Sequence, residues 1–270
     1  MVLPKPPQSF RLARRSSPTL LNQDISNPMI LEVCIESAES AVASEEGGAN
    51  RVELCGNLME GGTTPSSGMV ALTLERVSIP VMMMIRPRGG DFLYTDLEYE
   101  IMLRDIREAK RLSVYGVVFG LLTANGRIDK ERTGKLIEAA RPLSVTVHRA
   151  FDMTVDPFGA LEELISLGVD RILTSGQEPS TDKGIDLLAE LIKRAGDRII
   201  ILPGCGINEG NIAELVSKTG AKECHVTGKH QIPSQMTYTN PRVFMGVPGA
   251  PEYEKTVVDP ERIRALRSAI

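Results

Sequence analysis

The chain has few cysteines and lacks the marks of a membrane or secreted protein. Its four cysteines are spread over 270 residues without a CxxC pair, so we expect free thiols in a reducing compartment. No apolar run approaches the roughly 18 residues that span a bilayer, and the start lacks the apolar core of a secretory signal. The formal net charge of -4 does not indicate a nucleic-acid surface. We therefore expect a soluble, cytoplasmic protein that binds neither nucleic acid nor membrane.

Acidic residues are absent from residues 1–23, which are rich in proline and basic side chains. Such a segment cannot bury enough apolar surface to order itself, which favours a disordered tail over residues 1–28. Its arginine and serine content also fits an organellar transit peptide, which would change the expected location. We expect the folded domain to occupy residues 29–270.

From residue 30 onward, short β-branched or methionine-rich runs alternate with longer amphipathic stretches. Eight such runs, at intervals of roughly 20 to 35 residues, predict an α/β chain folded as a single-domain (β/α)8 TIM barrel. The runs are 30–34, 51–55, 81–86, 116–120, 144–149, 171–176, 199–204 and 223–228. Asp-Pro pairs at 156–157 and 259–260 predict the starts of two helices. Residues 229–256, rich in proline and glycine, predict a long loop after the eighth strand.

Alternation along the strands predicts which side chains face the barrel interior. Outward residues must be apolar because they pack under the helices, so Glu32 and Cys34 point inward, as do Arg51, Glu53 and Cys55 of the next strand. Polar groups buried in this way cost on the order of several kcal/mol each unless they are paired. They could simply pair with one another, or they could form an active site at the C-terminal ends of the strands.

Cys34 and Cys55 end neighbouring strands, which lie about 4.8 Å apart in a sheet. The two thiols could be inert apolar packing, a reversible disulfide, or ligands for a soft metal such as Cu(I). We expect the nearby Glu32 and Glu53 to raise the pKa of both thiols and so to oppose thiolate formation until metal binds.

Further candidate residues lie at the same mouth of the barrel. Arg86, at the end of the third strand, could hold a carboxylate or phosphate through its planar guanidinium. In HRAFDM, His148 and Asp152 could be a general base and its orienting group, or His148 could be structural. In PGCGINEGNI, Gly204 and Gly206 could form an anion site at a helix N-terminus, or serve only the backbone turn.

With these residues in place, the chain resembles the CutC family, the copper homeostasis proteins. The matching segments are LEVCIES, GGANRVELC, EGGTTPS, MIRPRGGDFLY, HRAFDM, LTSG and the PG-x-GI turn. The resemblance implies a (β/α)8 barrel, a cytosolic or organellar location, homo-oligomers, and a role in copper handling. It also implies that Cys34 and Cys55 are the candidate Cu(I) ligands, and it implies no established reaction.

Two positions differ from the pattern of the family that the chain resembles. Family members often have glycine where this chain has Cys205, and some have cysteine where it has Val226. Cys205 is therefore either an additional ligand or an incidental substitution, and the sequence does not support a copper site that uses a thiol just after the histidine of the eighth strand.

Two functions are compatible with these residues. The first is a copper homeostasis protein that holds Cu(I) between Cys34 and Cys55, with the neighbouring glutamates and Arg86 around the ligands. The second is a TIM-barrel enzyme that acts on a small phosphate- or carboxylate-bearing metabolite, with His148 or Glu53 as general base and Arg86 holding the anion.

Overall fold

Eight parallel strands form a closed barrel in the computed structural model, which describes residues 29–243, 245–246 and 251–270. The strands are β1 (Ile30–Ile35), β2 (Arg51–Leu54), β3 (Val81–Met84), β4 (Gly116–Phe119), β5 (Ser144–Val147), β6 (Arg171–Thr174), β7 (Ile200–Pro203) and β8 (Glu223–Val226). Strands consecutive in sequence pair from β1 to β7, β1 also pairs with β8, and a parallel bridge between Gly204 and His225 joins β7 to β8. The predicted TIM barrel is confirmed, whereas the predicted tail, 1–28, lies outside the described residues.

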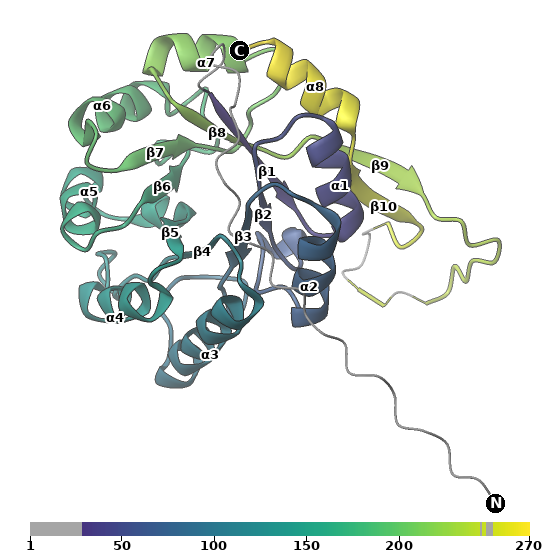
Figure 1. Cartoon of the computed structure of the whole chain (residues 1–270), viewed down its shortest axis with the longest axis horizontal. Helices are drawn as coiled ribbons and strands as arrows, with labels where there is room; N and C mark the ends of the chain where they lie inside the picture. The colour runs from purple at the N-terminus through teal and green to yellow at the C-terminus, as the bar shows by residue number, and fades with distance from the viewer. Residues whose placement is uncertain (1–28, 244, 247–250) are drawn as a thin grey trace, which may run out of the picture.

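Eight α-helices surround the strands in the described part of the chain (Figure 1). They are α1 (Ala38–Glu46), α2 (Ser67–Arg76), α3 (Asp96–Leu112), α4 (Lys130–Ala140), α5 (Pro157–Ser166), α6 (Ile185–Ala195), α7 (Ile212–Thr219) and α8 (Pro260–Ser268), with the short 3-10 helices η1 (Leu58–Glu60) and η2 (Arg149–Met153). Asp156 and Asp259 accept hydrogen bonds from the first free amides of α5 and α8, and a proline follows each of them. Both predicted helix starts are therefore confirmed.

Side-chain alternation separates an apolar outer layer from a distinct interior. Outward residues such as Val33 and Leu54 belong to the main hydrophobic core, which lies between strands and helices. A second buried cluster, made of Cys34, Cys55, Met82, Met84 and Val118, fills part of the barrel interior. The predicted inward direction of the two cysteines is thus confirmed.

A buried ion-pair network occupies the interior near the N-terminal ends of the strands. Arg51 donates through Nε to Glu32, and through Nη2 to Glu223 at 2.6 Å. Arg171 donates to the same Glu223 oxygen at 2.9 Å and to the Ser144 hydroxyl at 2.8 Å. Mutual pairing of charges therefore accounts for this lower layer of the barrel.

The prediction of a long loop over residues 229–256 was wrong at both ends of that segment. Strands β9 (Lys229–Pro233) and β10 (Glu254–Val258) pair antiparallel, and Figure 1 shows them extending from the barrel beside α1. The amide of Val258 donates to the Ser40 hydroxyl and so ties β10 to α1. The sequence did not reveal β9 because KHQIP is mostly exposed and lacks the apolar alternation of a half-buried strand.

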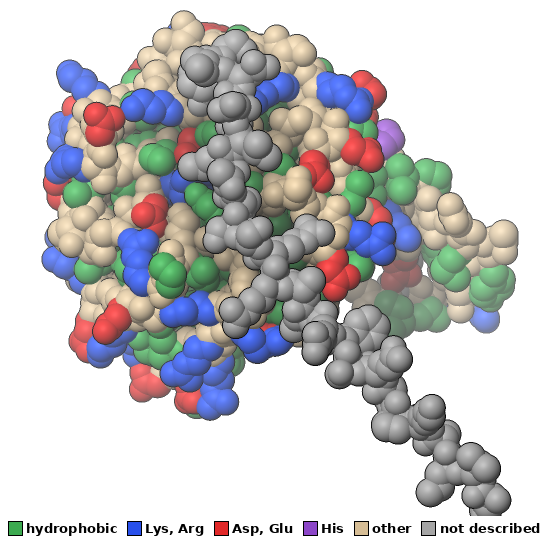
Figure 2. All heavy atoms as spheres, viewed as in Figure 1, with side chains coloured by type: hydrophobic (Ala, Val, Ile, Leu, Met, Phe, Trp, Pro, Cys, Tyr) green, Lys and Arg blue, Asp and Glu red, His purple; other side chains and the backbone are tan. Residues whose placement is uncertain are grey.

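No helix in the described ranges has both the length and the apolar character that a transmembrane span needs. Where the described side chains are visible in Figure 2, Lys and Arg alternate with Asp and Glu around the rim of the barrel. That part of the face therefore carries no dominant charge of one sign.

Candidate functional site

Five buried side chains from three adjacent strands meet at the C-terminal end of the barrel interior. They form two overlapping sets of three, and within each set the possible ligand atoms all lie within 4.8 Å of one another. The first set is Cys34, Glu53 and Cys55, and the second is Glu32, Glu53 and His225. His225 Nδ1 lies 2.8 Å from a Glu32 oxygen, and its Nε2 lies 3.7 Å from a Glu53 oxygen. Adjacent parallel pairing of β8, β1 and β2 brings these side chains together, because Glu32 lies opposite His225 and Cys34 lies opposite Glu53.

The charges in this cluster are arranged around His225. Burial alone would raise the pKa of Glu32, but Arg51 and His225 outweigh burial through their charges and hydrogen bonds and lower that pKa to about 2. Burial likewise opposes protonation of His225, yet Glu53, Cys34 and Glu32 raise its pKa well above the usual value. Glu32 is therefore ionised, and the imidazole is held as a cation beside the thiols.

The two thiols differ in their ionisation. The hydrogen bond from Cys55 lowers the pKa of Cys34 well below that of a free thiol, burial opposes this, and His225 reinforces it. The same contact with Cys34, together with burial and Glu53, raises the pKa of Cys55. The expectation that the glutamates raise the pKa of both thiols was thus wrong for Cys34. The hydrogen bond from Cys55 is the largest cause, and the hydrogen bonds from His225 and Glu53 act in the same direction, so Glu53 lowers the pKa of Cys34 instead of raising it.

The two thiols also differ in access to solvent. Cys34 lines a cavity of about 240 Å³, whereas Cys55 is fully buried beneath the loop that contains η1. Gly62 of this loop has φ +89, and a Cβ atom there would lie 3.1 Å from Cys55 Sγ. A larger residue at position 62 would therefore press on the thiol, so glycine lets the loop close over Cys55.

Methionines are residues of this site that sequence reasoning missed. Met82 and Met84 pack with both cysteines inside the barrel, and Met84 also lines the cavity. The signal was present in VMMMIR, because the alternation that places Cys34 inward also places the second and fourth residues of this run inward. Thioether sulfur is, like thiolate, a soft donor that suits Cu(I).

Arg86 lies at the cavity wall but does not pair with the glutamates. Its terminal nitrogens donate to three backbone carbonyls, those of Glu60 and Gly62 at 2.8 and 2.9 Å and that of Gly90 at 2.8 Å. The side chain is 5% exposed, and its guanidinium lies 5.2 Å from the centre of the Phe92 ring. Arg86 therefore anchors the loops after β2 and β3, a role that sequence reasoning did not assign to it.

His148 is a neutral, buried histidine on the same wall. Burial, and then the charge of Arg86, lower its pKa to about 3. Its Nδ1 accepts a hydrogen bond from the Ala150 amide at 3.1 Å, so the single ring proton resides on Nε2. Nε2 is buried and makes no hydrogen bond within the described ranges.

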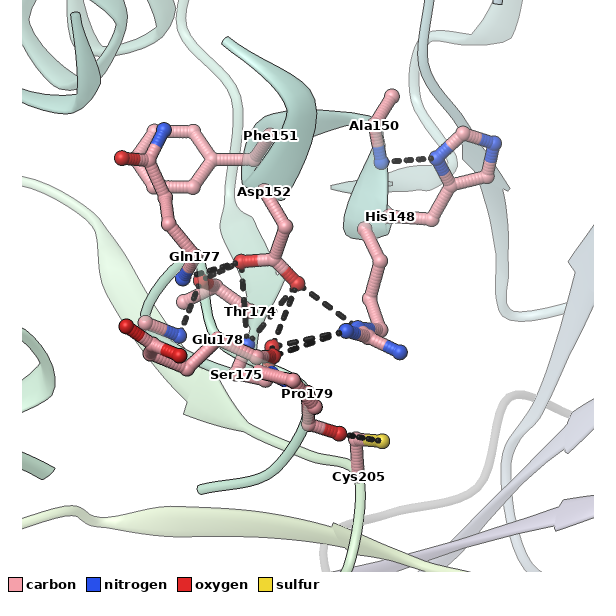
Figure 3. A network of polar contacts seen from close by, with 12 residues as sticks. His148, Ala150, Phe151, Asp152, Thr174, Ser175, Gln177, Glu178, Pro179 and Cys205 are labelled. Atoms are coloured by element: carbon pink, nitrogen blue, oxygen red, sulfur yellow. Dashed lines mark hydrogen bonds and ion pairs between the residues drawn. The ribbon is translucent and has the colours of Figure 1, made fainter. Parts of the chain in front are cut away.

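Asp152 does not orient His148. Figure 3 shows its carboxylate directed away from the imidazole, toward the loop after β6. It accepts hydrogen bonds from Arg149 at 2.7 Å, from the Ser175 and Gln177 amides, and from the hydroxyls of Thr174 and Ser175. The expected pairing of His148 with Asp152 is thus replaced by two separate arrangements, and Asp152 shapes a loop.

The turn after β7 has a packing reason for one of its glycines. A Cβ atom on Gly204 would lie 2.5 Å from Leu173 Cδ1 and 3.0 Å from His225 Cβ, so glycine leaves room for the histidine. The Gly206 carbonyl accepts hydrogen bonds from Asn208 and Asn211, and the Asn211 amide also donates to Asp182. A carboxylate thus lies near the start of α7, and the anion site at Gly204 and Gly206 stays a prediction.

Cys205 lies outside the cysteine cluster and has a strained backbone. Its thiol donates to the Pro179 carbonyl at 3.2 Å, as Figure 3 also shows, and its φ is +87. A side chain in this left-handed region costs roughly 1–2 kcal/mol. Glycine avoids this cost, but it loses more backbone entropy on folding, which offsets part of the gain.

We expect Cys205→Gly to raise the free energy of unfolding by about 0.5–1 kcal/mol in urea titrations. Cys205→Ala keeps the strain and is the control; equal stability of the two variants would show that φ is not the cause.

Comparisons with known proteins identify the family of the chain. A model of the CutC family matches residues 29–230. A family protein CutC from Parabacteroides distasonis is 53% identical over 87% of this chain and 98% of its own. The copper homeostasis protein cutC homologs of Mus musculus and Homo sapiens are 48% and 47% identical, over 90% of this chain and 89% of each of theirs.

Solved structures give the same result. The crystal structure of CutC from Streptococcus agalactiae matches with a TM-score of 0.70 and 36% identity, over 73% of this chain and 98% of that one. A thiamine phosphate pyrophosphorylase from Pyrococcus furiosus, with a TM-score of 0.54, 15% identity, and coverage of 90% and 96%, shares the fold alone. The family match, the identities and the barrel together show that the chain belongs to the CutC family.

Proposed function

We propose that the chain takes part in copper homeostasis by binding Cu(I) between the sulfurs of Cys34 and Cys55. The observation that carries this proposal is the pair of buried thiols with ligand atoms within 4.8 Å. Two metal–sulfur bonds of about 2.3 Å each bridge sulfurs that lie up to about 4.6 Å apart. The mouse and human relatives carry copper homeostasis in their names, and cysteine sulfur is the donor that Cu(I) prefers.

The electrostatics of the site support a monovalent metal on two thiolates. Such a complex carries one net negative charge, and the adjacent His225 cation balances it. The lowered pKa of Cys34 favours its thiolate, whereas the raised pKa of Cys55 makes its proton the more costly one to release on binding. Met84 offers a further soft sulfur on the cavity wall. Glu53 has an oxygen that is buried without a hydrogen bond in the described ranges.

A competition titration against a Cu(I) chelator under reducing conditions tests the proposal. We expect the Cys34→Ser/Cys55→Ser double variant to bind Cu(I) more than about 100-fold more weakly, because loss of an outer-shell partner alone costs 10–100-fold. The control is Cys205→Ser, which removes a thiol that lies outside the cluster and keeps a hydroxyl for the Pro179 carbonyl. Equal affinity of the double variant and the parent protein would exclude the site.

The second candidate is an enzyme that acts on a small anionic metabolite. It is favoured by the cavity beside the thiols, in which Cys34, His225, Arg86 and His148 face one space. Thermal-shift screening of metabolites separates the two functions: stabilisation that survives in the cysteine double variant and disappears in Arg86→Ala supports the enzyme. A cytoplasmic location and a homo-oligomer remain predictions.

A further inference from the structure

We propose that the cavity at the barrel mouth is a binding site for a small carboxylate anion, held by Arg86 and His148. The cavity has a volume of about 240 Å³ and opens at the C-terminal end of the strands. The inference goes beyond copper binding, and it names the ligand class that the enzyme alternative requires. It depends on no metal, so it can fail while copper binding stands.

The first support is the unbalanced charge of Arg86. The guanidinium is almost completely buried, and no Asp or Glu oxygen of the described residues lies within 4.0 Å of it. Its hydrogen bonds go to neutral carbonyls instead. A buried cation without a counter-ion is costly, and its field reaches His148, whose protonation it opposes. An anion in the cavity would supply the missing negative charge.

The second support is the donor on His148. Because Nδ1 accepts from the Ala150 amide, Nε2 carries the proton, and that N–H has no acceptor among the described residues. A buried donor without a partner costs roughly 1–3 kcal/mol. Arg86 and His148 both line the cavity, so a cation and an unsatisfied donor face one small space. Both groups favour an acceptor that is negatively charged.

The third support is the number of charges and the character of the walls. Arg149 and His225 also line the cavity, but Asp152 neutralises Arg149 at 2.7 Å and Glu32 lies 2.8 Å from the His225 ring. Among the described cations that line the cavity, Arg86 is then the one without an acidic partner. One unpaired positive charge matches a singly charged carboxylate better than a phosphate dianion. Met84, Phe92 and Leu173 complete the walls and suit a short apolar group on the anion.

The test uses the full-length, metal-free, reduced chain titrated with sodium acetate at neutral pH, with sodium chloride at equal ionic strength as the reference. The chain has three histidines, so their ring nitrogens can be followed individually by ¹⁵N NMR. We expect acetate, and not chloride, to shift the Nε2 resonance of His148 and to raise the melting temperature.

Two variants locate the binding. We expect Arg86→Gln and His148→Asn each to weaken acetate binding by more than about tenfold, the effect of losing a hydrogen bond to a charged group. The asparagine can still accept from the Ala150 amide, so it tests the Nε2 donor without removing the loop contact. Arg86→Lys should recover part of the affinity, because it restores the charge.

Arg88→Gln is the matched control, since Arg88 lies two positions from Arg86 but pairs with Glu98 and Asp91 outside the cavity lining. It should bind acetate as the parent protein does. Absence of any acetate-specific shift would overturn the proposal, as would acetate binding that persists in both variants. Tighter binding of inorganic phosphate than of acetate would overturn the assignment to carboxylates. None of these outcomes affects the copper titration, which depends on the cysteines.

Discussion

Arg51→Met is expected to lower the free energy of unfolding by about 3–5 kcal/mol, the usual cost of removing one partner from a buried ion pair. Arg51 is 4% exposed and joins Glu32 to Glu223. Those two carboxylates raise the pKa of Arg51 although burial lowers it, so the pairing outweighs desolvation. Methionine fills a similar volume but leaves Glu32 without its main counter-charge. Urea unfolding followed by circular dichroism measures the loss.

The surface pair Arg104–Glu100 provides the control. Its side chains are 70% and 53% exposed, so Arg104→Met should change stability by less than about 0.5 kcal/mol.

The pH dependence of the stability loss shows whether it comes from the buried charges. The pKa of Glu32 is lowered, so its contribution is present above its ordinary pKa of 4.5 and is lost as the pH falls toward 2. The difference between parent and Arg51→Met should therefore shrink in acid; a difference that does not vary with pH would point to packing instead.

His148 is expected to make the protein sensitive to mild acid. Its pKa is lowered from 6.5 to about 3, so the unfolded chain takes up a proton in this range while the folded protein does not. Stability is therefore lost as the pH falls below 6.5, at up to about 1.4 kcal/mol for each pH unit. His148→Asn lacks this group, and the stability of the parent relative to the variant should fall steadily between pH 6 and pH 4.

Urea unfolding at a series of pH values gives this difference directly, because all other titrating groups are shared. His230 is exposed and serves as the matched control, so His230→Asn should follow the parent at every pH. Parallel curves for the parent and His148→Asn would show that His148 is protonated in the folded protein.

The sequence was sufficient for the barrel and for part of the site. Period-two alternation depends only on backbone geometry, so it placed Cys34 and Cys55 inward, and applied to VMMMIR it would have placed Met84 there as well. Alternation does not say which inward side chains contact one another. The pairing of Glu32 with both Arg51 and His225 was therefore not predicted. Those contacts depend on strand register across the junction of β8 with β1.

The loop residues were harder to predict, for a different reason. Arg86 is held by carbonyls of loops whose path depends on glycines with positive φ, such as Gly62 and Gly90. Asp152 turns toward the amides after β6, although its position in HRAFDM places it close to His148 in sequence. Such directions follow from tertiary packing of loops, which residue spacing does not encode.

The pairing of β1 with β8 has a kinetic consequence. Glu32 and His225, which meet in the site, are separated by 193 positions, so their contact is one of very high sequence separation. Contacts of this kind carry a large loop-closure entropy and form slowly compared with local ones. The contact of His225 with Glu32, and with it the complete set of five side chains, therefore exists only after the two ends of the barrel have joined. A growing chain on the ribosome therefore has no complete site until its eighth strand has emerged.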